Sequence, residues 1–90
     1  MKVLIVHAHP EPHSFTAALR DQAVQTFEAQ GHNVQVSDLH AMNWNPVASA
    51  EDFSARENPE YLVYALEQRL GVKNQSIAPD IQQELDKLLW

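Results

Sequence analysis

The sequence predicts an α/β fold in which a parallel sheet is flanked by helices. Residues 3–6 form a continuous apolar run, β-branched at three of four positions, as in strands that are buried on both faces of a parallel sheet. From Phe15 onward, apolar side chains recur at helical spacing, and this pattern ends near Gly31, a residue typical of the position after a helix. Residues 34–36 alternate apolar and polar positions, which indicates a second strand. Together they make one βαβ unit with a right-handed crossover.

The second half of the chain is predicted to be mostly irregular and helical. Residues 39–47 follow no simple period and are expected to form an ordered loop. Ser49, followed by two acidic residues, suits the start of a short helix. The segment 58–60 suggests a second helix with proline in its first turn, which could extend to Leu70. A last helix opens at residues 78–80 and carries Ile81, Leu85, Leu88 and Leu89 on one side.

Two strands are too few for a stable open sheet. We therefore expect residues 1–90 to be the N-terminal portion of a single α/β domain, truncated after its first βαβ unit and the helices that follow. Assembly of two copies across an uncovered strand edge is an alternative that the sequence leaves open.

Composition excludes several classes of function. The 90 residues include 12 acidic and 6 basic side chains, a formal charge of −6, which argues against a nucleic-acid partner. The absence of cysteine excludes a thiol nucleophile and a thiolate metal site. The opening apolar run is far too short for a signal-peptide core or a membrane span. These features favour a cytoplasmic protein with no membrane insertion.

The loop between the first strand and the first helix is the strongest candidate for a ligand site. Free backbone amides and the positive end of the helix dipole attract phosphate at a helix start. An imidazole at His9 or His13, with the hydroxyls of Ser14 and Thr16, could add hydrogen-bond donors. In the alternative interpretation, Ser14 only caps the helix and the histidines are exposed loop residues. Local pattern alone does not decide between the two.

Metal and hydrolase chemistry are both disfavoured. His7 and His9 are two positions apart, so at a strand end their side chains point to opposite faces. No zinc-binding signature occurs, and we expect no metal site. Ser14 lacks the flanking glycines that a nucleophile elbow requires.

Three ordered motifs resemble the NAD(P)H:quinone oxidoreductases, a family of flavin enzymes with a flavodoxin-like fold. Residues 4–10 and 13–16 resemble the opening of that family. Residues 37–47 resemble the segment after its second strand, and residues 78–81 resemble the stretch that leads toward its third strand. The resemblance covers nearly the whole chain and implies a flavodoxin-like fold.

The same resemblance implies roles for four residues. His9 would contact the phosphates of a flavin dinucleotide, and Ser14, Phe15 and Thr16 would hold the pyrophosphate at the helix start. Thr16 stands where the family commonly has asparagine, which predicts weaker binding. FAD is the expected cofactor, and FMN is possible. No catalytic residue is expected in residues 1–90, because the family's loops around the flavin ring come later in its chain.

The implied activity is the two-electron reduction of quinones by NAD(P)H in a homodimer. Residues 1–90 would supply only the phosphate-binding part, so this chain alone is expected to have little or no activity. An alternative is a non-catalytic regulatory subunit, since relatives of the family also bind potassium-efflux transporters.

Overall fold

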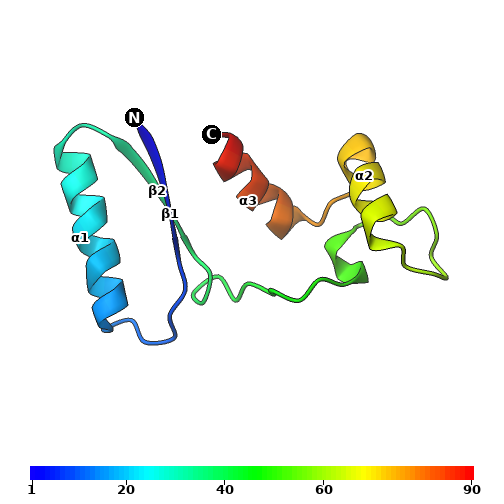
Figure 1. Cartoon of the computed structure of the whole chain (residues 1–90), viewed down its shortest axis with the longest axis horizontal. Helices are drawn as coiled ribbons and strands as arrows, with labels where there is room; N and C mark the ends of the chain where they lie inside the picture. Colours follow the sequence, from blue (N-terminus) through cyan, green and yellow to red (C-terminus); the bar gives the residue numbers. More distant parts are fainter. The chain divides into compact units, whose positions relative to one another are not determined.

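The computed structural model describes all 90 residues and divides them into two compact units. One unit comprises Met1–Asn45 with Lys87–Trp90, and the other comprises Pro46–Asp86. Along the chain the elements are β1 (Lys2–His7), α1 (Phe15–Ala29), β2 (Asn33–Asp38), a 3-10 turn η1 (Ala50–Asp52), α2 (Tyr64–Asn74) and α3 (Pro79–Leu89), as labelled in Figure 1. None of the helices combines the length and apolar character that crossing a membrane demands.

The predicted βαβ unit is confirmed. Strands β1 and β2 pair in parallel, with a register that runs from Lys2 opposite Asn33 to His7 opposite Asp38. Helix α1 connects them and lies alongside the two strands (Figure 1). Because the strands are parallel and in register, both end at the same edge of the sheet, where His7 and Asp38 are paired.

Both ends of α1 are capped by local hydrogen bonds. At its start, the Ser14 side chain accepts a hydrogen bond from the Ala17 N–H at 3.1 Å, as an N-cap does. At its end, Gly31 has φ of 86° and donates to the Glu28 carbonyl, while the His32 N–H donates to the Phe27 carbonyl. This is the Schellman arrangement, which favours glycine, and it confirms the helix end predicted near Gly31.

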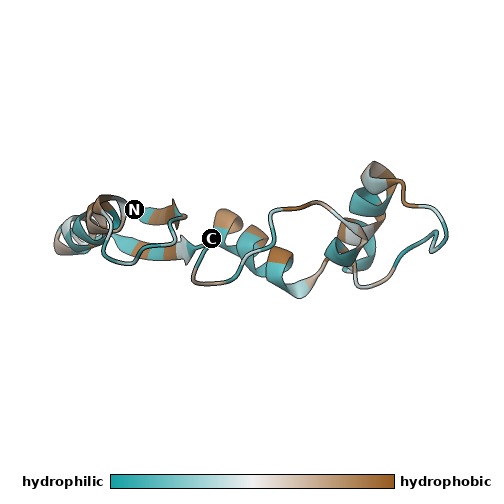
Figure 2. Cartoon of the chain, turned by 90° about the horizontal axis from the view of Figure 1, so that it is seen from below, coloured by the Kyte–Doolittle hydropathy of each residue, from teal (hydrophilic) through white to brown (hydrophobic).

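The expectation that the first strand is buried on both faces is wrong for this chain. Val6 is 60% exposed, and the only fully buried apolar residue of the first unit is Ala17 of α1. The physical reason is that a two-stranded sheet with one helix beside it offers too little surface to cover the strand. The mixed colouring of α1, β1 and β2 in Figure 2 shows apolar as well as polar residues on these elements.

The second unit is held together around Phe53. Phe53 forms an isolated antiparallel bridge with Ile77, and its ring meets the ring of Tyr64 edge-to-face at 5.2 Å between centroids. The Ala78 N–H donates to the Asp52 carbonyl at 2.7 Å. The helix start predicted at Ser49 is confirmed as η1, with a capping box between Ser49 and Asp52.

The predicted start of the second helix is wrong. Helix α2 begins at Tyr64 and not near Pro59, and it ends at Asn74 and not at Leu70. The Asn58 side chain accepts from the amides of Glu60 and Tyr61, which folds this segment into a turn. The same bonding pattern occurs at helix starts, but here the helix does not begin until Tyr64.

The carboxylate of Glu67 on α2 organises the same segment. Glu67 is 2% exposed, and its two oxygens accept separately from the backbone amides of Glu57 at 3.0 Å and Asn58 at 3.1 Å. A buried carboxylate is tolerated where backbone donors satisfy it. Glu67 therefore fixes the chain that leads into α2.

We expect Glu67→Gln to lower the free energy of unfolding by about 1–3 kcal/mol, because one carboxamide position is an NH2 group that would face a backbone N–H. Urea denaturation followed by circular dichroism measures this change. Glu60→Gln makes the same chemical change at an exposed residue and should leave stability unchanged. Equal stability of the two variants would show that Glu67 has no such role.

The phenol of Tyr64 donates a hydrogen bond to the Asp52 carboxylate. This hydrogen bond, then burial and then the carboxylate charge raise the pKa of Tyr64 above the ordinary value of 10.0. Since the folded-state pKa is raised, the stability that this pair contributes is present below that ordinary value and is lost as pH rises through the folded-state pKa.

We expect Asp52→Asn to lower the pKa of Tyr64 toward the ordinary value, because the substitution removes the negative charge. A spectrophotometric titration of phenolate absorbance measures the pKa directly. The background should be Tyr61→Phe, in which Tyr64 is the only tyrosine. An identical titration midpoint with Asp52 and with Asn at position 52 would refute the assignment.

Candidate functional site

The connection between β1 and α1 is folded by its own side chains. The Glu11 N–H donates to His9 Nδ1 at 2.9 Å, and the His13 N–H donates to a Glu11 carboxylate oxygen at 2.9 Å. The Ser14 N–H donates to the Glu11 carbonyl at 3.2 Å. These three bonds turn the chain from the strand end into the helix start.

The hydrogen bond at His9 fixes which ring nitrogen can donate. Nδ1 accepts from a backbone amide, so it carries no proton, and the neutral imidazole then carries its proton on Nε2. His9 is partly exposed. Its imidazole can therefore present an N–H donor to an incoming acceptor while its other nitrogen holds the loop.

The start of α1 offers backbone donors next to this loop. The first intrahelical bond runs from the Ala18 N–H to the Ser14 carbonyl, so the amides of Phe15 and Thr16 have no carbonyl partner within the helix. The Ala17 amide is taken by the Ser14 hydroxyl oxygen, whose own hydrogen can still be donated. Phe15 is 79% exposed and Thr16 is also exposed, so the helix start is accessible.

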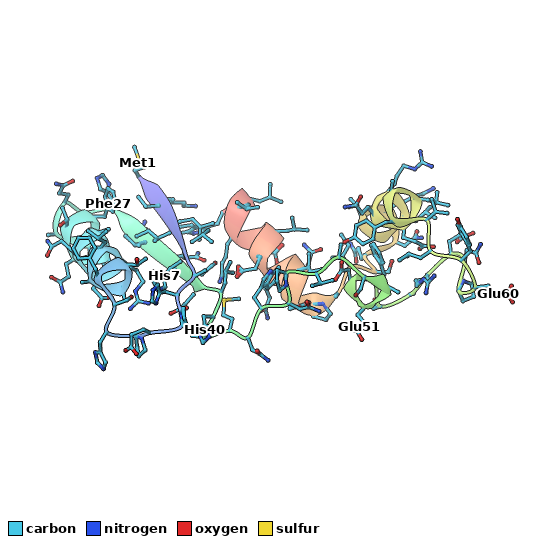
Figure 3. All side chains as sticks on the ribbon, turned by 60° about the horizontal axis from the view of Figure 1, so that its bottom comes forward. Met1, His7, Phe27, His40, Glu51 and Glu60 are labelled. Atoms are coloured by element: carbon cyan, nitrogen blue, oxygen red, sulfur yellow. The ribbon has the colours of Figure 1, made fainter.

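A pocket of about 320 Å³ lies at the carboxyl end of the two strands. In Figure 3, the labelled His7 and His40 lie at this end, and Met1 lies at the opposite end of β1. Three imidazoles, two prolines, an ion pair and one alanine line the pocket. These residues are His7, His9, Pro10, Pro12, Arg20, Asp38, His40 and Ala41. Ligands bind at this edge in open α/β sheets.

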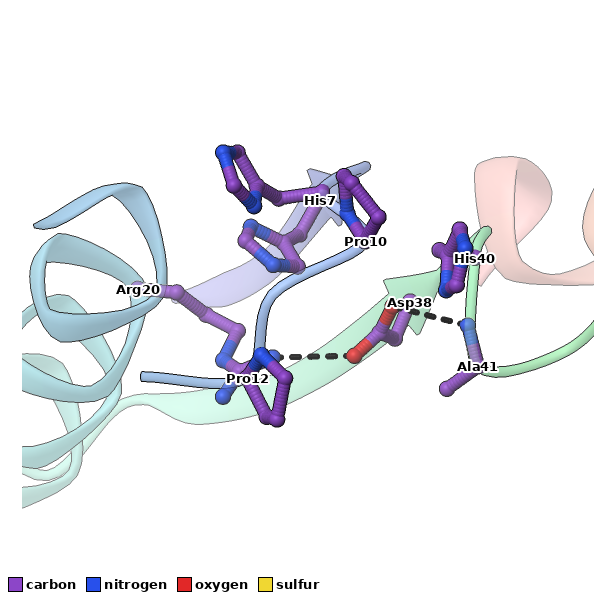
Figure 4. Close-up of a pocket in the computed structure, with 8 residues that line it drawn as sticks. His7, Pro10, Pro12, Arg20, Asp38, His40 and Ala41 are labelled. Atoms are coloured by element: carbon purple, nitrogen blue, oxygen red, sulfur yellow. Dashed lines mark hydrogen bonds and ion pairs between the residues drawn. The ribbon is translucent and has the colours of Figure 1, made fainter. Parts of the chain in front are cut away.

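An ion pair forms one wall of the pocket. Arg20 of α1 reaches Asp38 at the end of β2, with 2.9 Å between Nη1 and Oδ2 (Figure 4). The other Asp38 oxygen accepts from the Ala41 N–H at 3.2 Å. Both carboxylate oxygens are therefore engaged, which gives Asp38 a structural role here.

The four residues predicted to form the site lie in the loop after β1 and at the start of α1, but they do not line the same pocket. His9 lines the pocket, whereas Ser14, Phe15 and Thr16 lie outside its lining. Ser14 acts as the helix N-cap, the role that the alternative interpretation of this loop gives it.

Sequence reasoning did not identify Arg20, Asp38 and His40 as members of this region. Asp38 and His40 could have been found, since both lie at the carboxyl end of a predicted parallel strand. Arg20 could not, because its contact with Asp38 depends on how α1 is rotated against the sheet.

Comparisons with known proteins identify relatives over the whole length. The human ribosyldihydronicotinamide dehydrogenase [quinone] is 44% identical over 88 residues, which cover 97% of this chain and 38% of that protein. The guinea pig (Cavia porcellus) NAD(P)H dehydrogenase [quinone] 1 is 38% identical over 88 residues, which cover 97% of this chain and 32% of that protein. The chain thus spans about a third of the length of these relatives.

A solved structure gives the same result. A crystal structure of a candidate quinone reductase from Klebsiella pneumoniae superposes with a TM-score of 0.94 at 40% sequence identity, covering 100% of this chain and 35% of that one. Together, these findings confirm the resemblance to the quinone oxidoreductases. Residues 1–90 also match the family described by its flavodoxin-like fold, and the chain belongs to that family.

Proposed function

We propose that this chain provides the phosphate-binding part of a flavin-dependent NAD(P)H:quinone oxidoreductase. The observation that carries the proposal is the start of α1, where two amides have no helical partner and the loop that leads into the helix carries a histidine whose Nε2 can donate. The names of the relatives, which are quinone dehydrogenases, support the reaction class.

The donors fit a phosphorylated cofactor. The backbone amides of Phe15 and Thr16, the Ser14 hydroxyl and His9 Nε2 are all hydrogen-bond donors, and phosphate oxygens are acceptors. The family resemblance favours FAD, and FMN could use the same donors for its single phosphate. Bound flavin would supply the two-electron hydride chemistry that links NAD(P)H to a quinone.

The residues of this chain would bind and orient the cofactor. The helix dipole adds a favourable field for the negative phosphates, and the His9–Glu11 bond keeps the imidazole in place. We assign no catalytic residue within residues 1–90.

An amide-resolved titration tests the phosphate site. In nitrogen-15 NMR spectra, FAD and ADP should shift the amide signals of Phe15 and Thr16. Riboflavin has the same ring system as FAD but no phosphate, and it should leave both signals unchanged. Shifts with riboflavin, or no shift with either phosphorylated ligand, would contradict the proposal.

Two substitutions at Ser14 should separate helix capping from phosphate binding. Ser14→Ala removes the cap and should lower the free energy of unfolding by about 1 kcal/mol. Ser14→Asp keeps a capping oxygen, so stability should be retained, but its negative charge should weaken the binding of FAD and ADP. Thermal denaturation and the NMR titration measure the two effects. Undiminished binding by the aspartate variant would argue against a phosphate at this position.

We expect residues 1–90 with FAD to oxidise NADH or NADPH at the background rate when a soluble quinone is the acceptor. We expect no acceleration because residues 1–90 contain no residue to which we assign a catalytic role. Absorbance of the reduced nicotinamide measures the rate, and FAD without protein is the control. Turnover well above that control would place catalytic groups inside residues 1–90 and refute the assignment.

A further inference from the structure

We infer that Arg20 is a positioning residue, which holds the phosphate-binding start of α1 in place through its ion pair with Asp38 and thereby sets the affinity for phosphorylated ligands. This inference rests on the proposed function. Arg20 itself is assigned no contact with the ligand.

Few side chains attach the first turns of α1 to the strands. Ala17 is the only buried residue of the helix, at 1% exposed, and its methyl group provides a small contact. Arg20 follows one turn later, so it lies near the same face of the helix. Its side chain is 20% exposed and spans from α1 to the end of β2. Ala23, Val24 and Phe27 are half-buried and belong to the later turns of the helix. Within residues 15–20, only Ala17 and Arg20 are not exposed, so the orientation of the helix start depends mainly on these two side chains.

Asp38 joins the helix to the strand edge and to the next loop. It is the last residue of β2 and is paired in register with His7. Its side chain receives Arg20 Nη1 at 2.9 Å and the Ala41 N–H at 3.2 Å. The Leu39 N–H also donates to the His7 carbonyl at 2.8 Å. Arg20 therefore connects α1 to the same strand ends that lead into the His9 loop.

The charge of Arg20 is already compensated. Nε and Nη2 lie 3.0 Å from the Asp21 carboxylate, and Nη1 is bound to Asp38. A guanidinium between two carboxylates has little free charge to offer a phosphate. This distinguishes positioning from direct binding, because a direct phosphate ligand would become more available when Asp38 is neutralised.

The two possible roles of Arg20, positioning the helix and binding phosphate directly, predict opposite effects of Asp38→Asn on ligand affinity. If Arg20 positions the helix, neutralising Asp38 should weaken binding of FAD and ADP, because the connection between α1 and β2 is loosened. If Arg20 binds phosphate directly, the same substitution should leave binding unchanged or tighten it. Displacement of a binding group by a fraction of an ångström to 1 Å is enough to produce a measurable loss.

The experiment compares FAD and ADP dissociation constants, measured by NMR titration, for the wild-type chain and its variants. We expect Arg20→Ala and Asp38→Asn each to weaken binding by about tenfold. The double variant should be no weaker than either single one, since both remove the same link. Arg20→Lys keeps a positive charge near Asp38 and should recover part of the affinity. Arg69→Ala removes the same charge at an exposed arginine and should bind like wild type.

Circular dichroism at the titration temperature establishes that each variant is folded. Wild-type affinity in a folded Arg20→Ala variant, or tighter binding by Asp38→Asn, would overturn the inference and leave the proposed function standing. Absence of FAD and ADP binding by the wild-type chain would overturn both. An affinity that is lost in Arg20→Ala and not at all recovered in Arg20→Lys would also contradict the role of the ion pair.

Discussion

The parallel pairing of β1 with β2 is the constraint on which the candidate site depends. It places His7 and Asp38 opposite each other at one edge of the sheet. From that edge, one connection leads through His9 to the start of α1, and another leads through His40 and Ala41. A shift of the register by one residue would turn Asp38 to the other face and remove it from Arg20.

Acidic side chains accept several of the backbone hydrogen bonds that strands and helices satisfy internally. Asp38 binds an arginine and a loop amide, Asp52 binds a capping amide and a tyrosine, and Glu67 binds two loop amides. In each case a carboxylate satisfies backbone donors in irregular segments, which would otherwise lose hydrogen bonds on leaving water. Some of the acidic residues of the chain therefore stabilise its irregular segments, in addition to adding negative charge to the surface.

The parts of the fold that were predictable from sequence are those determined by local pattern. The apolar run of β1, the cap at Ser14 and the helix end at Gly31 each have a local signal, and each was found in the structure. The start of α2 was predicted too early because Asn58 and Pro59 have the local pattern of a helix start, whereas the structure forms only a turn there. The chain before this turn is fixed by Glu67, which lies later in the sequence. Likewise, the position of His9 followed from the strand end, whereas the Arg20–Asp38 contact joins residues 18 apart and needs three-dimensional packing.

The exposed apolar side chains have a consequence for handling the isolated polypeptide. Val6, Phe15, Val72 and Leu88 are each at least 60% exposed, while the formal charge of −6 keeps molecules apart. Added salt screens that repulsion, and sulfate or phosphate also strengthens contact between apolar surfaces. Colloidal stability of this polypeptide should therefore be greatest in dilute buffer and should fall as ionic strength rises.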